Sequence, residues 1–276
     1  MSLYAVLGHP IDHSLSPRIH EAFGVLTGRV VRYERREVHP GGLAHALRTF
    51  ASEGGRGANI TVPLKGEAFA LAARTTARAQ RARAVNTLSW EGEAWAGDNT
   101  DGAGLVCDLT VNYGWPLEGR RIVLLGAGGA AQGIIGPLLD QGIAHLAIFN
   151  RTLERARNVA ESCADARVGV IGSGTGSDTP PFDIVINATA AGLAGSLPMI
   201  PGIPDAFFHD VIAYDLMYGP KARDFLGYAR AHGARAVADG LGMLVEQAAE
   251  SFQVWHGVRP PTAPVLTRLR SEIGGG

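Results

Sequence analysis

The residues with the most readily interpreted chemistry form a glycine-rich turn. Gly126, Gly128 and Ala131 fill the three fixed positions of the pattern G-x-G-x-x-G/A, directly after an apolar run at residues 122–125. In a strand–turn–helix unit, the first glycine permits the tight turn, the second lets a pyrophosphate approach the backbone, and the third small residue lets helix and strand pack closely. Free N–H groups and the positive end of the helix dipole then hold phosphates. A plain glycine turn gives the same pattern, so the motif alone favours a dinucleotide site without establishing one.

Arginines follow the second strand expected in this unit. An NAD-binding unit usually carries Asp or Glu about 20 residues beyond the glycines, whereas an arginine there accommodates a 2′-phosphate. The chain has Asn150, Arg151, Thr152 and Arg155 at this point. Because the planar guanidinium matches phosphate geometry, these residues predict NADP. The alternative is an ordinary helix start, with Thr152 as its cap and solvated arginines.

A lysine and an aspartate are the candidates for proton transfer. Lys65 is one of only two lysines in the chain, the other being Lys221. Thr61 and Lys65 lie where a strand expected at residues 58–62 ends, and ligands of parallel α/β sheets gather at the carboxyl ends of strands. A lysine at a strand end is more often merely solvated. Asp101 has a structural alternative as well, as the N-cap of the helix that begins there.

Two serines near the N-terminus differ in how easily they are explained. Ser16 followed by Pro17 is a strong helix start, with serine at the N-cap and proline at the first helical position. That interpretation leaves Ser14 unexplained. His9 and His13 are four residues apart, but Pro10 argues against a shared helical turn. We therefore expect no metal site there.

The elements that must position these residues alternate between strands and helices, which is typical of an α/β fold with largely parallel sheets. In the first half we expect strands at 3–7, 30–38, 58–62, 87–90 and 94–97, and helices at 18–26, 43–53, 67–74 and 101–112. In the second half we expect strands at 122–125, 145–149, 168–171, 184–187, 212–215 and 235–238, and helices at 129–140, 152–162, 222–232 and 243–255. The second half is predicted to be a doubly wound dinucleotide domain.

Composition narrows the functional class. The 276 residues are 46% hydrophobic and 18% charged, with a net charge of −1. This composition lacks the excess of positive charge that is typical of proteins that bind nucleic acid or an anionic membrane. Cys107 and Cys163 are far apart, so we expect neither a disulfide nor a zinc site, and a cytoplasmic location. Residues 122–139 are almost wholly apolar but contain five glycines and Pro137. A strand and helix buried on both sides explain them better than a membrane span.

Nine motifs in order along the chain resemble one family, shikimate dehydrogenase. They are Gly8 to Pro17, Asn59 to Lys65, Ala84 to Leu88, Gly97 to Gly102, Gly126 to Ala130, Asn150 to Thr152, Asn187 to Thr189, Tyr214 to Tyr218, and Asp239 to Gln247 with the two alanines after it. Each motif is weak by itself. Together they cover nearly the whole chain, and their shared order is highly specific.

The resemblance implies a reversible, NADP-dependent reduction of 3-dehydroshikimate to shikimate, a step towards aromatic amino acids. It implies an α/β substrate domain with a mainly parallel sheet at residues 1–100, completed by C-terminal helices at 241–276. It further implies a Rossmann-type NADP domain at 101–240, with the active site in a cleft between the domains. The partners expected are the small-molecule substrate and NADP, with no nucleic acid, membrane or metal. The protein is expected to be a monomer or homodimer.

The resemblance also carries roles over, residue by residue. Lys65 and Asp101 would be the catalytic pair, with Lys65 the acid/base and Asp101 its orienting partner. Burial favours a neutral lysine and a nearby carboxylate favours a charged one, so the sequence leaves the charge of Lys65 open. The residues implied to bind the substrate are Ser14 and Ser16 through its carboxylate, and Thr61, Asn86, Tyr218 and Gln247. The residues implied to bind the cofactor are Gly126, Ala127, Gly128, Gly129, Ala130, Asn150, Arg151, Thr152, Arg155, Thr189 and Gly240.

One departure and two rival functions stand beside this prediction. Arg83 occupies a position where a small residue is common, which would put a bulky cation near the sheet. A quinate/shikimate dehydrogenase that uses NAD would be expected to carry an acidic residue near Arg151 and an altered pair at Ser14 and Ser16. A non-catalytic metabolite sensor on the same scaffold would be expected to lack Lys65 or Asp101, or to have gained a DNA-binding segment.

Overall fold

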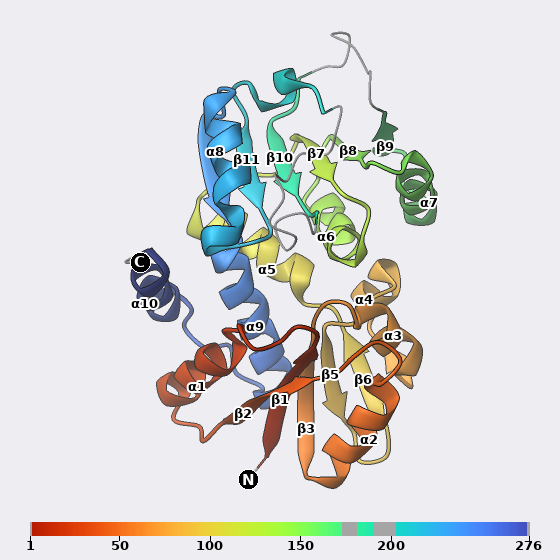
Figure 1. Cartoon of the computed structure of the whole chain (residues 1–276), viewed down its shortest axis with the longest axis vertical. Coiled ribbons are helices and arrows are strands. Elements are labelled where there is room, and N and C mark those ends of the chain that lie inside the picture. The colour runs from red at the N-terminus through yellow and green to blue at the C-terminus, as the bar shows by residue number, and fades with distance from the viewer. Residues whose placement is uncertain (1, 173–180, 190–202, 275–276) are drawn as a thin grey trace. The chain divides into compact units, whose positions relative to one another are not determined.

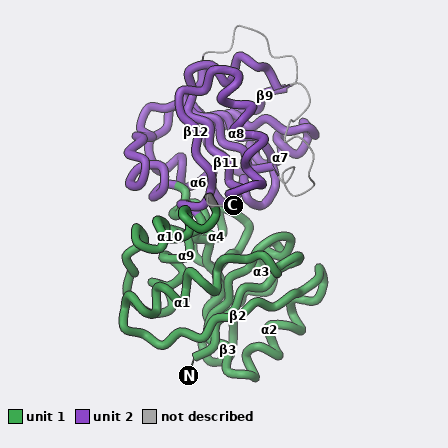
Figure 2. Tube along the Cα trace, turned by 60° about the vertical axis from the view of Figure 1, so that its left-hand side comes forward, with its two compact units in different colours: residues 1–105, 244–276 green, residues 106–243 purple. Residues whose placement is uncertain are grey.

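The computed structural model describes residues 2–172, 181–189 and 203–274. The chain divides into two compact units (Figure 2). Unit 1 contains residues 1–105 and 244–276, and unit 2 contains residues 106–243. The C-terminal helices therefore belong to the same unit as the N-terminus.

Unit 1 contains the following elements in chain order: β1 Leu3–Gly8, α1 Ser16–Thr27, β2 Arg32–Glu37, α2 Leu43–Ser52, β3 Gly55–Ile60, α3 Lys65–Leu71, β4 Arg74–Thr75, α4 Ala77–Ala82, β5 Thr87–Trp90, β6 Trp95–Asp98, most of α5 Asp101–Cys107, most of α9 Leu241–His256 and α10 Ala263–Gly274. Its sheet has the order β2-β1-β3-β5-β6-β4. Neighbouring strands run parallel except where β5 pairs antiparallel with β3 and with β6.

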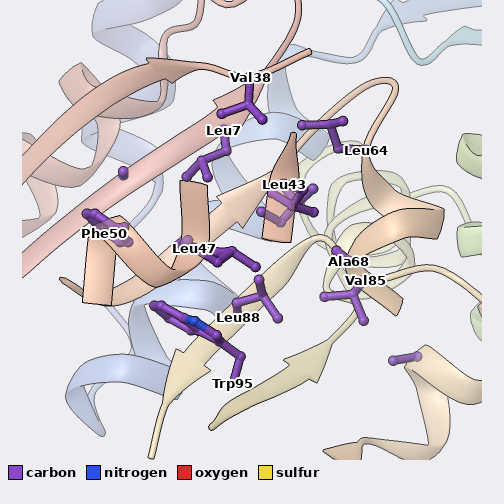
Figure 3. Packing of buried hydrophobic residues seen from close by; sticks show 14 of the residues in the cluster. Leu7, Val38, Leu43, Leu47, Phe50, Leu64, Ala68, Val85, Leu88 and Trp95 are labelled. Carbon is purple, nitrogen blue, oxygen red and sulfur yellow. The ribbon is translucent and has the colours of Figure 1, made fainter. Parts of the chain in front are cut away.

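Strand β1 lies inside the sheet of unit 1 and is buried along its whole length. Because successive side chains of a strand point to opposite faces, Leu3, Ala5 and Leu7 enter a core beneath α2, while Tyr4 and Val6 enter a separate cluster. Figure 3 shows Leu43, Leu47 and Phe50 of α2 within that first core. Trp255 of α9 packs against the second cluster, and its indole Nε1 donates to Leu88 O at 3.1 Å. Both faces of the sheet are thus covered.

Unit 2 consists of η1 Asp108–Asn112, β7 Arg121–Leu125, α6 Gly129–Asp140, β8 His145–Phe149, α7 Leu153–Cys163, β9 Val168–Ile171, β10 Ile184–Asn187, η3 Asp205–Phe208, β11 Ile212–Asp215, η4 Gly219–Ala222, α8 Arg223–Ala231 and β12 Ala236–Asp239. Its sheet is parallel throughout, in the order β12-β11-β10-β7-β8-β9 (Figure 1). This is the strand order of a doubly wound dinucleotide domain.

The apolar stretch at residues 122–139 contains a buried strand and a helix. It covers β7 and nearly all of α6, whose side chains are mostly buried. Over the residues that the structure describes, no helix has the length and apolar character to cross a membrane.

Three local features differ from the sequence-based expectations. Ser16 is the first residue of α1 and not its N-cap, because Leu15 holds the cap position and no side chain caps the helix. The helix expected at 67–74 is α3 at Lys65–Leu71, and the short β4 and α4 that follow it were not expected. Arg83 ends α4 in the left-handed conformation, with φ +48°, and its side chain is exposed. That conformation favours glycine, and because the Arg83 side chain is exposed, the cation does not pack near the sheet.

Candidate active site

Lys65 and Asp101 form an ion pair within unit 1. Lys65 begins α3 and Asp101 begins α5, and the two helices follow different strands of the sheet. The Lys65 Nζ lies 2.5 Å from Asp101 Oδ2, with side chains 16% and 8% exposed. A charge-assisted bond in so little water is stronger than one at the surface. The structure therefore brings together the two residues that the sequence proposed for proton transfer.

Asn86 fixes the other oxygen of Asp101. Its side-chain Nδ2 donates to Asp101 Oδ1 at 2.8 Å and to Thr100 Oγ1 at 2.9 Å, and it lies 3.3 Å from Gln247 Oε1. The Asn86 Oδ1 accepts from the backbone N–H of Thr100 at 2.8 Å. Since both ends of this buried amide are satisfied, the carboxylate of Asp101 is held in one orientation.

Asp101 is also positioned through the backbone turn that precedes it. The Asp101 N–H donates to Asn99 Oδ1 at 3.1 Å, so Asn99 caps the helix that Asp101 was expected to cap. Before this turn, Asp98 accepts two bonds from Arg78, each 2.7 Å long, and one from the Thr76 hydroxyl at 2.6 Å. Burial acts to raise the pKa of Asp98, but the bonds from Arg78 and Thr76 outweigh it, and the pKa is lowered. The turn is thereby clamped to α4.

Gln247 is buried at the margin of α9. Its Nε2 donates to Leu244 O at 2.9 Å, and its Oε1 also lies 3.4 Å from Thr100 Oγ1. One turn further along α9, Ser251 lies 2.8 Å from Thr87 Oγ1 and accepts from Asn59 Nδ2 at 2.9 Å. The side chain of Gln247 is therefore not solvated, and it joins the network around Asn86.

The serine pair and Thr61 lie at the carboxyl ends of β1 and β3. The Ser14 hydroxyl lies 3.2 Å from the Ser16 hydroxyl and accepts from the Ser16 backbone N–H at 3.3 Å. Arg35 of β2 donates twice to the Ser14 carbonyl, at 2.6 and 2.9 Å. The Thr61 backbone N–H donates to Leu7 O at 2.9 Å. Ser14 and Ser16 thus present adjacent hydroxyls from a loop that is anchored to the sheet.

The glycine turn in unit 2 connects β7 to α6. Gly126 has φ +106°, a conformation that L side chains rarely adopt, and its N–H donates to Phe149 O at 2.8 Å. A Cβ on Gly126 would lie 3.1 Å from Ala188 O, whereas at Gly128 and Gly129 nothing lies within 4 Å of that position. Gly128 is the N-cap of α6 and carries no side-chain cap. Open space against free helical N–H groups fits a pyrophosphate, and Ala127 and Ala130 flank it on the same turn.

The predicted 2′-phosphate residues follow β8. Asn150 donates from Nδ2 to Thr152 O at 2.8 Å, which orders the start of α7. Thr152 is the N-cap of α7, but its side chain makes no capping bond. The side chains of Arg151 and Arg155 are exposed. Two exposed guanidiniums at the end of β8 can bind a dianionic phosphate.

Thr189, Tyr218 and Gly240 follow three neighbouring strands of unit 2. The Thr189 N–H and hydroxyl donate to Asn187 Oδ1 at 3.1 and 2.8 Å. Burial raises the pKa of Tyr218, and Asp239 adds to that rise. Gly240 lies against the backbone that directly follows β11, because a Cβ at Gly240 would lie 2.3 Å from Leu216 O. These residues lie at the carboxyl edge of the parallel sheet, where ligands of this fold bind.

An aspartate of the same edge has an unusual environment. Asp215 accepts from the Met217 N–H at 2.9 Å and from Asn187 Nδ2 at 3.1 Å. Burial raises the pKa of Asp215 to about 7, and the charge of Asp239 acts in the same direction, against those hydrogen bonds. Asp215 therefore titrates near neutral pH and supports the segments that carry Thr189 and Tyr218.

Sequence reasoning missed the residues that support this site. Asn59, Arg78, Thr100 and Ser251 were not singled out. One signal was available, because Ser251 follows Gln247 by four residues and so shares its helix face. The pairing of Arg78 with Asp98 left no local sequence signal.

The fold and site define a class of protein, with a dinucleotide-type parallel domain and a second α/β domain that contains a buried lysine–carboxylate pair. Three family models match the chain: the shikimate dehydrogenase substrate binding domain at residues 6–88, shikimate / quinate 5-dehydrogenase at 110–194, and the shikimate 5′-dehydrogenase C-terminal domain at 240–270.

Named relatives extend this match to the full length. The chain is 50% identical to the shikimate dehydrogenase (NADP+) of Alkalilimnicola ehrlichii over 270 residues, which cover 98% of each chain. The fold is similar to that of an Ael1 enzyme from Pseudomonas putida, with 41% identity, a TM-score of 0.90 and 98% of each chain covered. It is also similar to shikimate 5-dehydrogenase from Thermus thermophilus in complex with NADP(H) and shikimate, at 32% identity and a TM-score of 0.86, covering 98% of this chain and 99% of that one. The chain belongs to the shikimate dehydrogenase family.

Proposed function

We propose that this chain catalyses the reversible, NADP-dependent reduction of 3-dehydroshikimate to shikimate, a step towards aromatic amino acids. The observation that carries the proposal is the buried pair of Lys65 and Asp101, with Asn86 on the second carboxylate oxygen. Reduction of a ketone builds negative charge on its oxygen, so a proton donor must lie within hydrogen-bond reach. A positioned ammonium meets that requirement.

The reacting ketone receives a hydride on carbon and a proton on oxygen. Bound NADPH supplies the hydride. In this proposal Lys65 Nζ donates the proton as the alcohol forms, and it accepts a proton in the reverse direction. Asp101 Oδ2 holds Nζ in place, and Asn86 keeps Asp101 from rotating. The protein thus contributes position and a fixed charge.

Substrate recognition is proposed to come from polar side chains of unit 1 together with Tyr218 of unit 2. The hydroxyls of Ser14 and Ser16 bind the carboxylate of the substrate. Thr61, Asn86, Tyr218 and Gln247 contact its remaining polar groups, mainly its hydroxyls. Hydroxyl and amide donors suffice for a carboxylate that keeps part of its hydration.

The cofactor side is proposed to lie in unit 2, with the turn at 126–130 on the pyrophosphate. Asn150, Arg151, Thr152 and Arg155 bind the 2′-phosphate side of the adenosine, and Thr189 and Gly240 complete the site. The two arginines that follow β8, Arg151 and Arg155, support NADP as the cofactor over the NAD of the rival quinate/shikimate dehydrogenase. The intact Lys65 and Asp101 pair supports an enzyme over a metabolite sensor. The enzyme is proposed to act in the cytoplasm as a monomer or homodimer, without nucleic acid or membrane partners.

A steady-state assay of shikimate oxidation with NADP and with NAD tests this function. We expect a substantially higher kcat/KM with NADP than with NAD, and with shikimate than with quinate. Turnover with neither cofactor would favour the sensor. A preference for NAD together with quinate would favour the rival dehydrogenase.

A further inference from the structure

Three potential metal ligands meet at the carboxyl ends of two neighbouring strands of unit 1. His9 directly follows β1, Glu37 ends β2, and His39 lies two residues further on. Each residue offers one ligand atom, and these atoms all lie within 4.8 Å of one another. The His9 Nδ1 lies 2.7 Å from Glu37 Oε1, and the rings of His9 and His39 are 4.0 Å apart between centroids. The sequence analysis considered His9 only with His13 and expected no metal site there, whereas the structure brings His9 close to residues about 30 positions away.

The backbone on both sides of this group is held by the fold. Gly8 and Glu37 are register partners of the parallel pair β1 and β2. The His9 N–H donates to Val62 O at 3.0 Å, and the Val38 N–H donates to Gly8 O at 3.0 Å. His39 O accepts from the Gly42 N–H at 3.0 Å. The three side chains therefore start from fixed backbone positions, with their ligand atoms already within 4.8 Å of one another.

The ligand set matches borderline divalent metals. Two imidazoles and one carboxylate are a known three-ligand zinc set that leaves a fourth position open. Imidazole suits Zn²⁺, Ni²⁺ and Cu²⁺, whereas Mg²⁺ and Ca²⁺ prefer oxygen ligands alone. Tetrahedral zinc with bonds of roughly 2.0–2.2 Å places its ligand atoms about 3.3 Å apart. To reach that value, His9 Nδ1 and Glu37 Oε1, now 2.7 Å apart, would move apart by a few tenths of an ångström, and the other ligand atoms, within 4.8 Å of one another, would draw slightly closer.

The interaction now present between these side chains is easily replaced. His9 and Glu37 are 39% and 46% exposed, and an ion pair so open to water contributes little to stability. A metal ion would replace the hydrogen bond between the His9 imidazole and the Glu37 carboxylate and bind both groups. Replacing this exposed interaction costs the fold little stability, and the three side chains gain bonds to the ion.

We propose that His9, Glu37 and His39 form a binding site for a divalent transition-metal ion, of the zinc class, in unit 1. The ion joins the loop after β1 to the loop after β2. The first of these loops carries Ser14, so the site lies on the segment that presents the serine pair. The proposal is independent of the function proposed above.

Calorimetric titration of the chelator-treated full-length chain with Zn²⁺ tests the site. The variants are His9→Asn, Glu37→Gln and His39→Asn, one for each ligand. The matched control is His45→Asn, because His45 is an exposed histidine on nearby α2 that is absent from the cluster. Far-ultraviolet circular dichroism of each variant checks that it folds. Thermal unfolding with and without Zn²⁺ gives a second readout, because an ion bound only by the folded chain raises Tm.

We expect one Zn²⁺ per wild-type chain at a site that each ligand variant weakens at least about 10-fold, since even indirect support of a metal ligand is worth that much. The Tm rise with Zn²⁺ should shrink in the same three variants and persist in His45→Asn. No Zn²⁺ binding by the wild type, or binding that survives unchanged in folded His9→Asn and His39→Asn, would overturn the proposal.

Discussion

The two units of the molecule build their candidate sites by different means. In unit 1, side chains from α3, β5, α5 and α9 meet in one buried hydrogen-bond network around Asn86. In unit 2, the turn at 126–130 offers mostly backbone N–H groups and open space, with exposed arginines after the next strand. The proposed proton transfer would therefore depend on long-range packing, whereas the proposed dinucleotide recognition would depend on a local backbone shape.

The largest effect is expected in the side-chain network of unit 1. Asp101→Asn removes the charge that holds Lys65 and sets an amide against the donor of Asn86. We expect kcat to fall by about 10²-fold, the scale of lost acid–base catalysis, with cofactor affinity little changed. Steady-state kinetics at saturating shikimate and NADP measure this fall. Glu93→Gln, an exposed change of the same kind, is the control; an equal loss in both variants would contradict the role of Asp101.

The next effect concerns the arginines of unit 2. Arg151→Ala should raise the KM for NADP roughly 10- to 100-fold, because a charge-assisted hydrogen bond is worth about 1.5–3 kcal/mol. The KM for NAD should change little, because NAD lacks the 2′-phosphate. Arg157→Ala, at an exposed position of α7, the helix that begins two residues after Arg151, serves as the control. Equal losses with both cofactors would remove Arg151 from 2′-phosphate recognition.

A pH effect follows from Asp215 in unit 2. Burial, reinforced by Asp239, raises the pKa of Asp215 to about 7 in the folded chain, above an unfolded value of about 3.9. The folded state therefore binds this proton more tightly. The stability that this tighter proton binding adds to the folded state is fully present below about pH 4 and is lost as pH rises through about 7.

Asp215→Asn, which cannot ionise, should flatten that dependence. Differential scanning calorimetry at pH 5 and pH 8 should show a smaller Tm difference in the variant than in the wild type. Asp224→Asn, at an exposed position of α8, should keep the wild-type difference. An equal Tm difference between pH 5 and pH 8 in Asp215→Asn and in the wild type would show that Asp215 does not cause this pH dependence.

The smallest effect is local to α4 in unit 1. Arg83→Gly should stabilise the chain by about 0.5–1 kcal/mol. The left-handed conformation costs a non-glycine residue about 1–2 kcal/mol, and the larger entropy that glycine loses on folding offsets part of the gain from removing that cost. Thermal unfolding should show a rise in Tm of about 2 °C. Gln80→Gly, inside the same helix, should lower Tm instead. A lower Tm in Arg83→Gly would show that the arginine makes a compensating interaction.

The sequence predicted the strands of unit 2 to within about one residue at each end. Parallel strands such as β7 and β10 are buried on both faces, so each is an uninterrupted apolar run between turns. The glycine turn and the arginines after β8 are local motifs and could also be read directly. Family membership, the fold class and NADP as the family's cofactor are confirmed by the comparisons.

Unit 1 was predicted less well, for physical reasons. Strand β2 lies at the sheet edge and is largely polar, so it does not show a buried pattern. Strand β4 has only two residues and α4 only six, too few for any periodicity to show. The contact between Asn86 and Gln247 joins positions 161 residues apart. No local pattern encodes such a contact, and it depends on α9 folding onto the sheet.

Lys65 is proposed to transfer the proton. Because the chain has only one other lysine, Lys221, that residue provides a matched control. The measurement compares Lys65→Ala with Lys221→Ala, whose lysine is exposed in unit 2, by kcat for shikimate oxidation and by direct titration of shikimate binding. The account predicts that Lys65→Ala lowers kcat at least about 10²-fold with shikimate affinity nearly unchanged, while Lys221→Ala retains wild-type turnover. Near wild-type turnover in Lys65→Ala would contradict it.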